Sequence, residues 1–229
     1  MEYRFSGESI MFLDENKLNN SRSWYQENKS RYQEHLQKPF IRLVNDLSPE
    51  MLKIDEYFET SPTIGKTLSR IHRDTRFSKD KSLYRDSMWL TFRTSMKNVH
   101  DYPSFYFELN PREYSYGMGF FCPGAPVMNA FRAAIDANED KFIKIIKKLE
   151  NNTTFTPEGE KYVRSKYTGS NDIVREWYDR KSIYVHCSSP KVIEAFDYEK
   201  LRDTLITEFA KLSDLYRFMK ESQMYYMNV

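Results

Sequence analysis

The sequence has few of the features that mark secreted, metal-binding or cofactor-binding proteins. Its two cysteines, Cys122 and Cys187, lie 65 residues apart without metal-type spacing, and the four histidines are scattered along the chain. We therefore expect no metal site. The N-terminus lacks the basic and apolar segments of a secretory signal, which predicts a cytoplasmic protein with both thiols reduced.

Long apolar runs and an excess of one charge are also lacking. The longest uncharged run, 114–131, is interrupted by glycines and prolines, so we expect no membrane-spanning helix. Lys and Arg number 35 and Asp and Glu 33, for a net charge of +2. This balance argues against a protein that coats polyanions along its whole surface, as histones do.

Glycine-rich nucleotide loops are incomplete, and we expect no cofactor. The segment 64–67 (IGKT) imitates the end of a phosphate-binding loop, but position 60 is Thr where the motif needs Gly. Gly117 and Gly119 are followed by Cys122 where a dinucleotide fingerprint needs a third glycine. Glycines within a predicted strand indicate a bulge or a close approach of the backbone to a neighbour, and a ligand is one such neighbour.

Aromatic residues make up 16% of the chain and must supply much of its buried area. Residues 7–53 have helical apolar spacing, with a break and a new helix start at 19–21 and a helix opened by Pro39. Helices are also expected from Pro126, after 138–140, and over 201–219 as one final helix.

Strands are predicted between these helical regions. The segments 87–94, 104–109 and 114–121 are rich in aromatic and apolar residues, and Asn110-Pro111-Arg112-Glu113 is a turn signal that predicts a hairpin. A short strand within 151–170 and a strand at 182–187 follow. The sequence thus predicts one α+β domain over 1–229, with N-terminal helices, a central mainly antiparallel sheet and C-terminal helices.

The positive charge is concentrated in one segment. Residues 61–100 contain nine basic and three acidic residues. The net positive charge of this segment is therefore larger than that of the whole chain. On an extended backbone Arg70, His72, Asp74 and Arg76 share one side, whereas on a helix the arginines fall on adjacent turns. Either conformation brings together several guanidinium groups, which grip carboxylate or phosphate through paired hydrogen bonds.

A family resemblance is carried by the same segment. The pattern Arg70-x-x-Arg73-Asp74-x-Arg76-Phe77-Ser78-x-Asp80-Lys81-x-x-Tyr84 resembles the signature of a widespread bacterial family, also found in fungi, that is catalogued only as a domain of unknown function. The family usually has Pro-Tyr-Lys where this chain has Leu83-Tyr84-Arg85. The resemblance implies a single α+β domain. It does not indicate an activity, because none is established for the family.

The Arg-rich segment supports three interpretations. The first is a site for a small phosphate- or carboxylate-bearing ligand, with Asp74 or Asp80 as the base if the site is catalytic. The second is a surface that docks nucleic acid or protein, and the third is a structural Arg–Asp network. Arg132, on a predicted helix, is either a surface or capping arginine or part of the pocket. The candidate ligand-binding residues are Arg70, Arg73, Arg76, Lys81, Tyr84, Arg132, Gly117 and Gly119.

Overall fold

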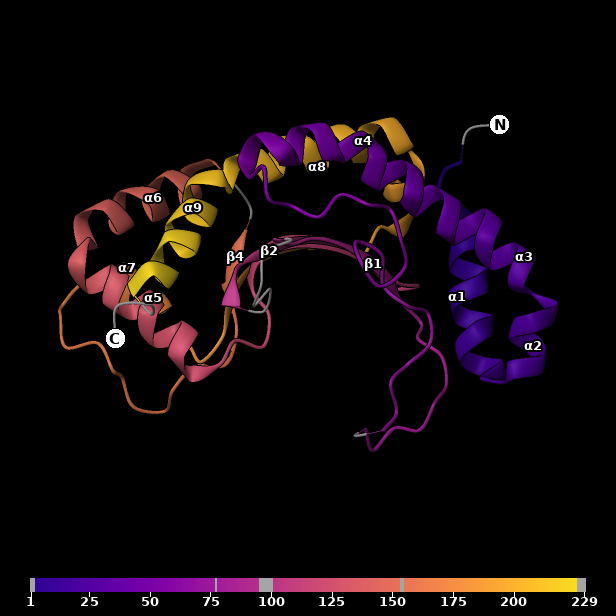
Figure 1. Cartoon of the computed structure of the whole chain (residues 1–229), viewed down its shortest axis with the longest axis horizontal. Coiled ribbons are helices and arrows are strands. Elements are labelled where there is room, and N and C mark those ends of the chain that lie inside the picture. The colour runs from indigo at the N-terminus through magenta and orange to yellow at the C-terminus, as the bar shows by residue number, and fades with distance from the viewer. Residues whose placement is uncertain (1–2, 77, 95–100, 153–154, 226–229) are drawn as a thin grey trace. The chain divides into compact units, whose positions relative to one another are not determined.

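The computed structural model describes residues 3–76, 78–94, 101–152 and 155–225 (Figure 1). The helices at the N-terminal end are α1 (Gly7–Asn19), α2 (Arg22–Glu27), α3 (Lys29–Tyr32), the π-helical η1 (Gln33–Gln37) and α4 (Lys38–Ile54). The strands are β1 (Met88–Phe92), β2 (Ser104–Leu109), β3 (Tyr114–Phe120), β4 (Thr156–Glu158) and β5 (Ile183–Ser189). The remaining helices are α5 (Ala125–Ala137), α6 (Glu139–Asn152), α7 (Asp172–Tyr178), the 3-10 helix η3 (Val192–Phe196), α8 (Tyr198–Lys211), α9 (Ser213–Ser222) and the 3-10 helix η4 (Gln223–Tyr225).

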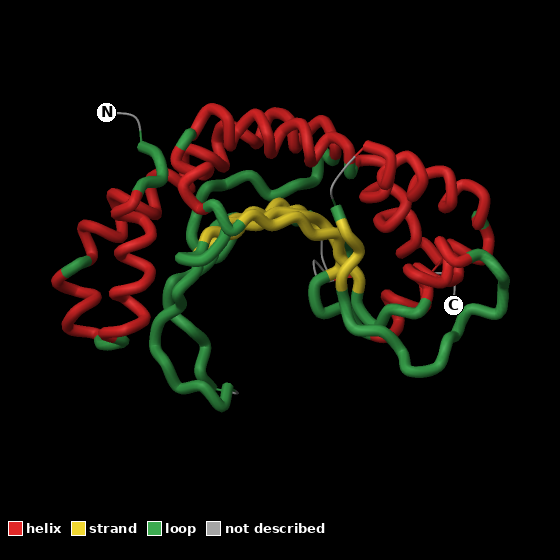
Figure 2. Tube along the Cα trace, turned by 180° about the vertical axis from the view of Figure 1, so that it is seen from behind, coloured by secondary structure: helices red, strands yellow, loops and turns green. Residues whose placement is uncertain are grey.

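The strands form an antiparallel sheet in the order β1-β2-β3-β5-β4 (Figure 2). Strands β2 and β3 are joined by the predicted turn, in which Asn110 accepts hydrogen bonds from the backbone amides of Arg112 and Glu113. Strand β4 pairs with β5 with Pro157 opposite Val185. Helices at both ends of the chain and a central antiparallel sheet confirm the predicted α+β fold.

The residues group into two compact units. Unit 1 comprises Met1–Phe92, Tyr106–Tyr116 and Ser188–Ile206, and unit 2 comprises Arg93–Phe105, Gly117–Cys187 and Thr207–Val229. The single domain expected from the sequence stays a prediction. No helix within the described ranges combines the length and the hydropathy needed to cross a bilayer.

The core of unit 1 is built on α4. Its buried positions recur at helical spacing, and Phe40 meets Phe5 edge to face at 4.9 Å between ring centroids. The predicted break between the first two helices is confirmed. Asn20 ends α1 in the left-handed conformation with φ 44°, and the Ser21 side chain accepts from the backbone amide of Trp24 to cap α2.

The core of unit 2 is an aromatic cluster that joins four helices. Phe142 of α6 lies 5.9 Å from Phe131 of α5, 5.7 Å from Trp177 of α7 and 5.1 Å from Phe218 of α9, between ring centroids. Phe142 is fully buried. Helix α7, which the sequence does not predict, therefore completes this core.

The prediction of one final helix is wrong. The chain forms α8 and α9, which are separated at Leu212. The Leu212 amide donates to the carbonyl of Phe209, three residues back, and the Ser213 hydroxyl donates to the carbonyl of Ala210. Leu212 is fully buried, so the apolar spacing runs unbroken across the break between the two helices and hides it from a periodicity argument.

Candidate functional site

The Arg-rich segment is one arm of a two-stranded ribbon, residues 67–91, which we call the basic ribbon. Backbone amides of Thr91 and Ser69 donate across it to Thr67 and Trp89. Further out, Arg73 donates to Leu83 at 2.9 Å. Figures 1 and 2 show the part of this segment that precedes β1 as a long loop that extends away from that strand.

Exposure along the ribbon alternates, which selects the extended conformation over the helical one. Arg70, His72, Asp74 and Arg76 are exposed, while the residues between them are buried or half-buried. Arg70 and Arg76 therefore share one face, and Arg73 lies on the other. The three arginines do not converge as a clamp on one small ligand.

Two of the three arginines are paired within the ribbon. Arg73 lies 3.1 Å from Asp80, and Arg76 lies 2.6 Å from Asp74. Hydrogen bonds from the Arg76 side chain and backbone lower the pKa of Asp74 to about 2. A carboxylate with so low a pKa is a weak proton acceptor near neutral pH, which argues against Asp74 as a general base. The pKa of Asp80 is also lowered, first by the backbone amide of Ser82.

Three further basic residues of the ribbon form no ion pair with any carboxylate that the structure describes. Arg70 and Lys79 make no hydrogen bond or ion pair with any residue that the structure describes, and Lys81 donates to the carbonyl of Thr75. Asp86 is engaged by Lys17 of α1 and by Arg112, and so does not neutralise them. The ribbon thus keeps a positive surplus.

The ribbon is anchored to the N-terminal helices. Tyr84 is only 2% exposed and stacks on Tyr25 of α2 at 5.0 Å between ring centroids. The backbone amide of Leu83 donates to the side-chain oxygen of Asn20 at 2.6 Å. Tyr84, a predicted ligand-binding residue, is therefore placed as part of this anchor.

We expect Asn20→Gly to loosen the ribbon. Glycine keeps the left-handed backbone of position 20 but removes the acceptor for the Leu83 amide, so the free energy of unfolding should fall by about 1 kcal/mol. Hydrogen exchange at the Leu83 amide measures the effect directly and should accelerate. Asn20→Asp, which retains an acceptor oxygen, should preserve protection. Unchanged Leu83 exchange in Asn20→Gly would show that this bond does not hold the ribbon.

The two glycine candidates lie within β3 and are buried. A Cβ at Gly119 would lie 2.3 Å from the Cα of Tyr184 in β5 and 2.5 Å from the carbonyl oxygen of Ile183. The predicted close approach is therefore present at Gly119, and the neighbour is another strand. A ligand role for Gly117 or Gly119 stays a prediction.

Arg132 is buried and has no carboxylate partner in the part of the chain that the structure describes. It is 5% exposed, and its guanidinium donates to the carbonyls of Tyr178 at 2.9 Å and Arg180 at 2.6 Å and to the Asn129 side chain at 3.1 Å. It forms no ion pair with any carboxylate that the structure describes. A buried charge usually has an ionic partner, because removal from water costs several kcal/mol.

This guanidinium borders an open depression of about 450 Å³ on unit 2, which we call the Arg132 depression. Among the residues that line it, the hydroxyl of Tyr178 donates to Asp136 at 2.9 Å. Burial and this bond together raise the pKa of Tyr178 to about 12. The lining residues are Asn129, Arg132, Ala133, Asp136, Lys166 and Tyr178.

The positive charge beside the depression affects the pKa of Tyr162. The Lys166 ammonium lies 4.1 Å from the centroid of its ring, Arg132 5.3 Å and Lys181 5.7 Å. Partial burial on its own would raise the pKa of the Tyr162 phenol. The hydrogen bond with Lys166 and the charge of Arg132 outweigh that effect and lower it.

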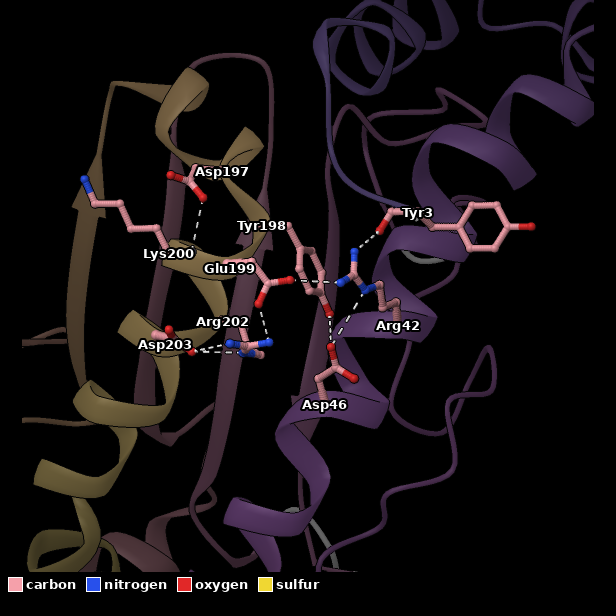
Figure 3. A network of polar contacts seen from close by, with 9 residues as sticks. All are labelled: Tyr3, Arg42, Asp46, Asp197, Tyr198, Glu199, Lys200, Arg202 and Asp203. Carbon is pink, nitrogen blue, oxygen red and sulfur yellow. Dashed lines mark hydrogen bonds and ion pairs between the residues drawn. The ribbon is translucent and has the colours of Figure 1, made fainter. Parts of the chain in front are cut away.

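A second cluster that contains arginines, in unit 1, joins α4 and α8 (Figure 3). Arg42 of α4 lies over the Tyr198 ring at 3.6 Å and pairs with Glu199 at 3.0 Å. The Tyr198 hydroxyl donates to Asp46 at 2.7 Å, and Arg202 pairs with Glu199. Each of these two guanidinium groups has a carboxylate partner, whereas Arg132 has none among the described residues.

Comparison with known proteins identifies the family. The family model described as conserved hypothetical protein (DUF2461) matches residues 8–218. The chain belongs to the DUF2461 family. The match includes both the basic ribbon and the Arg132 depression, and it confirms the resemblance seen in the sequence. No curated protein matches the chain.

Arg132 is the only one of the described residues around this depression that the sequence-based candidates include, and the basic residue Lys166 and its neighbour Tyr162 are absent from them. The available signal is the cluster of basic residues around a tyrosine at 161–166 (KYVRSK). The sequence predicts a loop for that segment, and nothing in the segment indicates that Arg132 of α5 lies next to it.

Proposed function

We propose that this DUF2461 protein binds a small phosphate- or carboxylate-bearing ligand in the Arg132 depression. The observation that carries the proposal is the buried guanidinium of Arg132, which has no carboxylate partner among the described residues. An anionic ligand would supply the missing charge.

The donor set suits such a ligand. Arg132 has five N–H donors, and three of its hydrogen bonds go to protein oxygens, with a further interaction to Tyr162. Lys166 is exposed and adds an ammonium group with three donors. Asp136 receives the Tyr178 hydroxyl on one oxygen and is an acceptor for a ligand hydroxyl. A hydroxylated ligand with one anionic group therefore fits best.

The site differs from the Arg70–Tyr84 pocket that the sequence suggests. In the basic ribbon, Arg73 and Arg76 are already paired with carboxylates and lie on opposite faces, and Tyr84 is buried in the anchor. The Arg132 depression is an open hollow, and its buried cation, Arg132, is held in place by protein carbonyls. A preorganised cation of this kind binds an anion without a further ordering cost.

Thermal denaturation with inorganic phosphate, sugar phosphates and hydroxy-dicarboxylates, at constant ionic strength, tests the proposal. A ligand at about a hundred times its Kd should raise the Tm by about 5–10 °C. Lys166→Ala should abolish most of the shift, and Lys147→Ala, an exposed lysine of α6, should retain it. A shift of equal size in Lys166→Ala, or none with any of these anions, would contradict the proposal.

A further inference from the structure

We infer that Arg85 and Arg73 bind the phosphate group of a phosphomonoester on the face of the sheet opposite α4 in unit 1. This goes beyond ligand binding in the Arg132 depression and is independent of it, because every residue involved belongs to unit 1. The observation that carries the inference is the half-buried guanidinium of Arg85. It forms no ion pair or hydrogen bond with any residue that the structure describes.

The position of Arg85 follows from its contact with Trp89. Helix α4 lies over one face of β1, along which buried and half-buried residues alternate (Figures 1 and 2). Trp89 is half-buried and therefore lies on the opposite face, as does Glu108 on the adjacent strand β2. The Arg85 guanidinium lies over the Trp89 ring, 4.8 Å from its centroid, and so belongs to this face.

Arg73 places a second guanidinium beside Arg85. The backbone amide of Arg85 donates to Ile71 and that of Arg73 to Leu83, both at 2.9 Å, so the two arginines are diagonal neighbours on one face of the basic ribbon. Burial and the charge of Arg73 lower the pKa of Arg85. The two like charges oppose each other, and a bound anion would stabilise both.

The nearby carboxyl groups leave this charge largely uncompensated. Asp80 lies 3.1 Å from Arg73, but their side chains are 57% and 28% exposed, and ion pairs at such exposure contribute little. Burial and the charges of neighbouring carboxylates raise the pKa of Glu108, which shifts this group towards its protonated form. In that form Glu108 donates a hydrogen bond to an anion and adds no negative charge.

A phosphomonoester fits this set of groups better than a carboxylate does. Two guanidinium groups match a doubly charged anion, and each can donate to a different terminal oxygen. The protonated carboxyl of Glu108 can donate to the remaining one. A carboxylate has a single charge and would compensate only one of the arginines. The half-buried Trp89 ring adds apolar surface for the group to which the phosphate is attached.

Isothermal titration calorimetry with phenyl phosphate tests this inference at about pH 7, where a phosphomonoester is mostly doubly charged. The full chain carries Lys166→Ala throughout, which weakens the Arg132 depression, and ionic strength is constant. Adding Arg85→Gln should weaken binding at least about tenfold. Arg73→Gln should weaken it less, because Asp80 already offsets part of that charge. Arg4→Gln, which removes an exposed arginine of the same unit, should leave the affinity unchanged.

Binding should also change the fluorescence of Trp89, and Trp89→Phe should remove that change. Circular dichroism establishes that each variant is folded, and Arg73→Gln decides the outcome if Arg85→Gln does not fold. The inference is overturned if phenyl phosphate does not bind, or if the folded arginine variants bind it as tightly as Arg4→Gln does. Equally tight binding of benzoate would overturn the choice of phosphate, and equally tight binding of inorganic phosphate would overturn the choice of a monoester.

Discussion

Gly119→Ala should lower the free energy of unfolding by about 3 kcal/mol. The added Cβ would lie 2.3 Å from the Cα of Tyr184 and 2.5 Å from the carbonyl oxygen of Ile183. Both atoms belong to the backbone of β5, so no side-chain rotation relieves the clash, and the two strands must separate. Urea denaturation followed by circular dichroism measures the loss.

Gly7→Ala is the matched control for this substitution. Gly7 begins α1, and a Cβ there has no atom within 4 Å. Alanine also favours the helix over glycine, so this variant should be as stable as the wild type or slightly more stable. If both substitutions cost the same, the effect at Gly119 comes from the loss of glycine in general and not from the close approach of β5.

Phe142→Ala should be the more severe change, with a loss of about 3–5 kcal/mol. The ring is fully buried and contacts aromatic rings from α5, α7 and α9, so its removal leaves a cavity that three helices must close together. The same variant should also weaken anion binding, because α5 carries Arg132 and α7 carries the Tyr178 carbonyl that accepts from it.

Phe121→Ala separates this effect from the general loss of an aromatic ring. Phe121 belongs to the same unit and lies 5.5 Å from Tyr184 between ring centroids, but it is 37% exposed. Its removal should cost about 1 kcal/mol. Equal losses for the two variants, measured by urea denaturation, would contradict the account of the unit 2 core.

The sequence correctly predicts those features of the fold that depend on short-range patterns of residues. The strand at 104–109 is confirmed at both ends, because alternating aromatic residues and the Asn110 turn signal are local. The alternation of exposure from Arg70 to Arg76 is also readable from an extended backbone. The break at Leu212 is not readable, because the apolar period continues through it.

The site in unit 2 depends on distant contacts and lies beyond such patterns. The sequence analysis includes Arg132 among the candidate residues. It leaves two roles equally open for this residue, a surface or capping arginine and a residue of the pocket. Its burial follows from hydrogen bonds to carbonyls 46 and 48 residues away, at the end of a helix that the sequence does not predict. Lys166 reaches the Arg132 depression from a loop. The local spacing of residues does not indicate that Arg132 or Lys166 comes to this site.

The pKa of Tyr162, measured with and without inorganic phosphate, tests the central claim most directly. Lys166 and Arg132 lower this pKa, so an anion bound between them and solvent should offset their charge and raise it. Tyrosine ring carbon-13 NMR, with the resonance assigned through Tyr162→Phe, follows the titration at constant ionic strength. The account predicts a higher Tyr162 pKa in phosphate, and in Lys166→Ala a pKa that is already raised and responds less. A Tyr162 pKa that phosphate leaves unchanged in the wild type would contradict an anion site at the Arg132 depression.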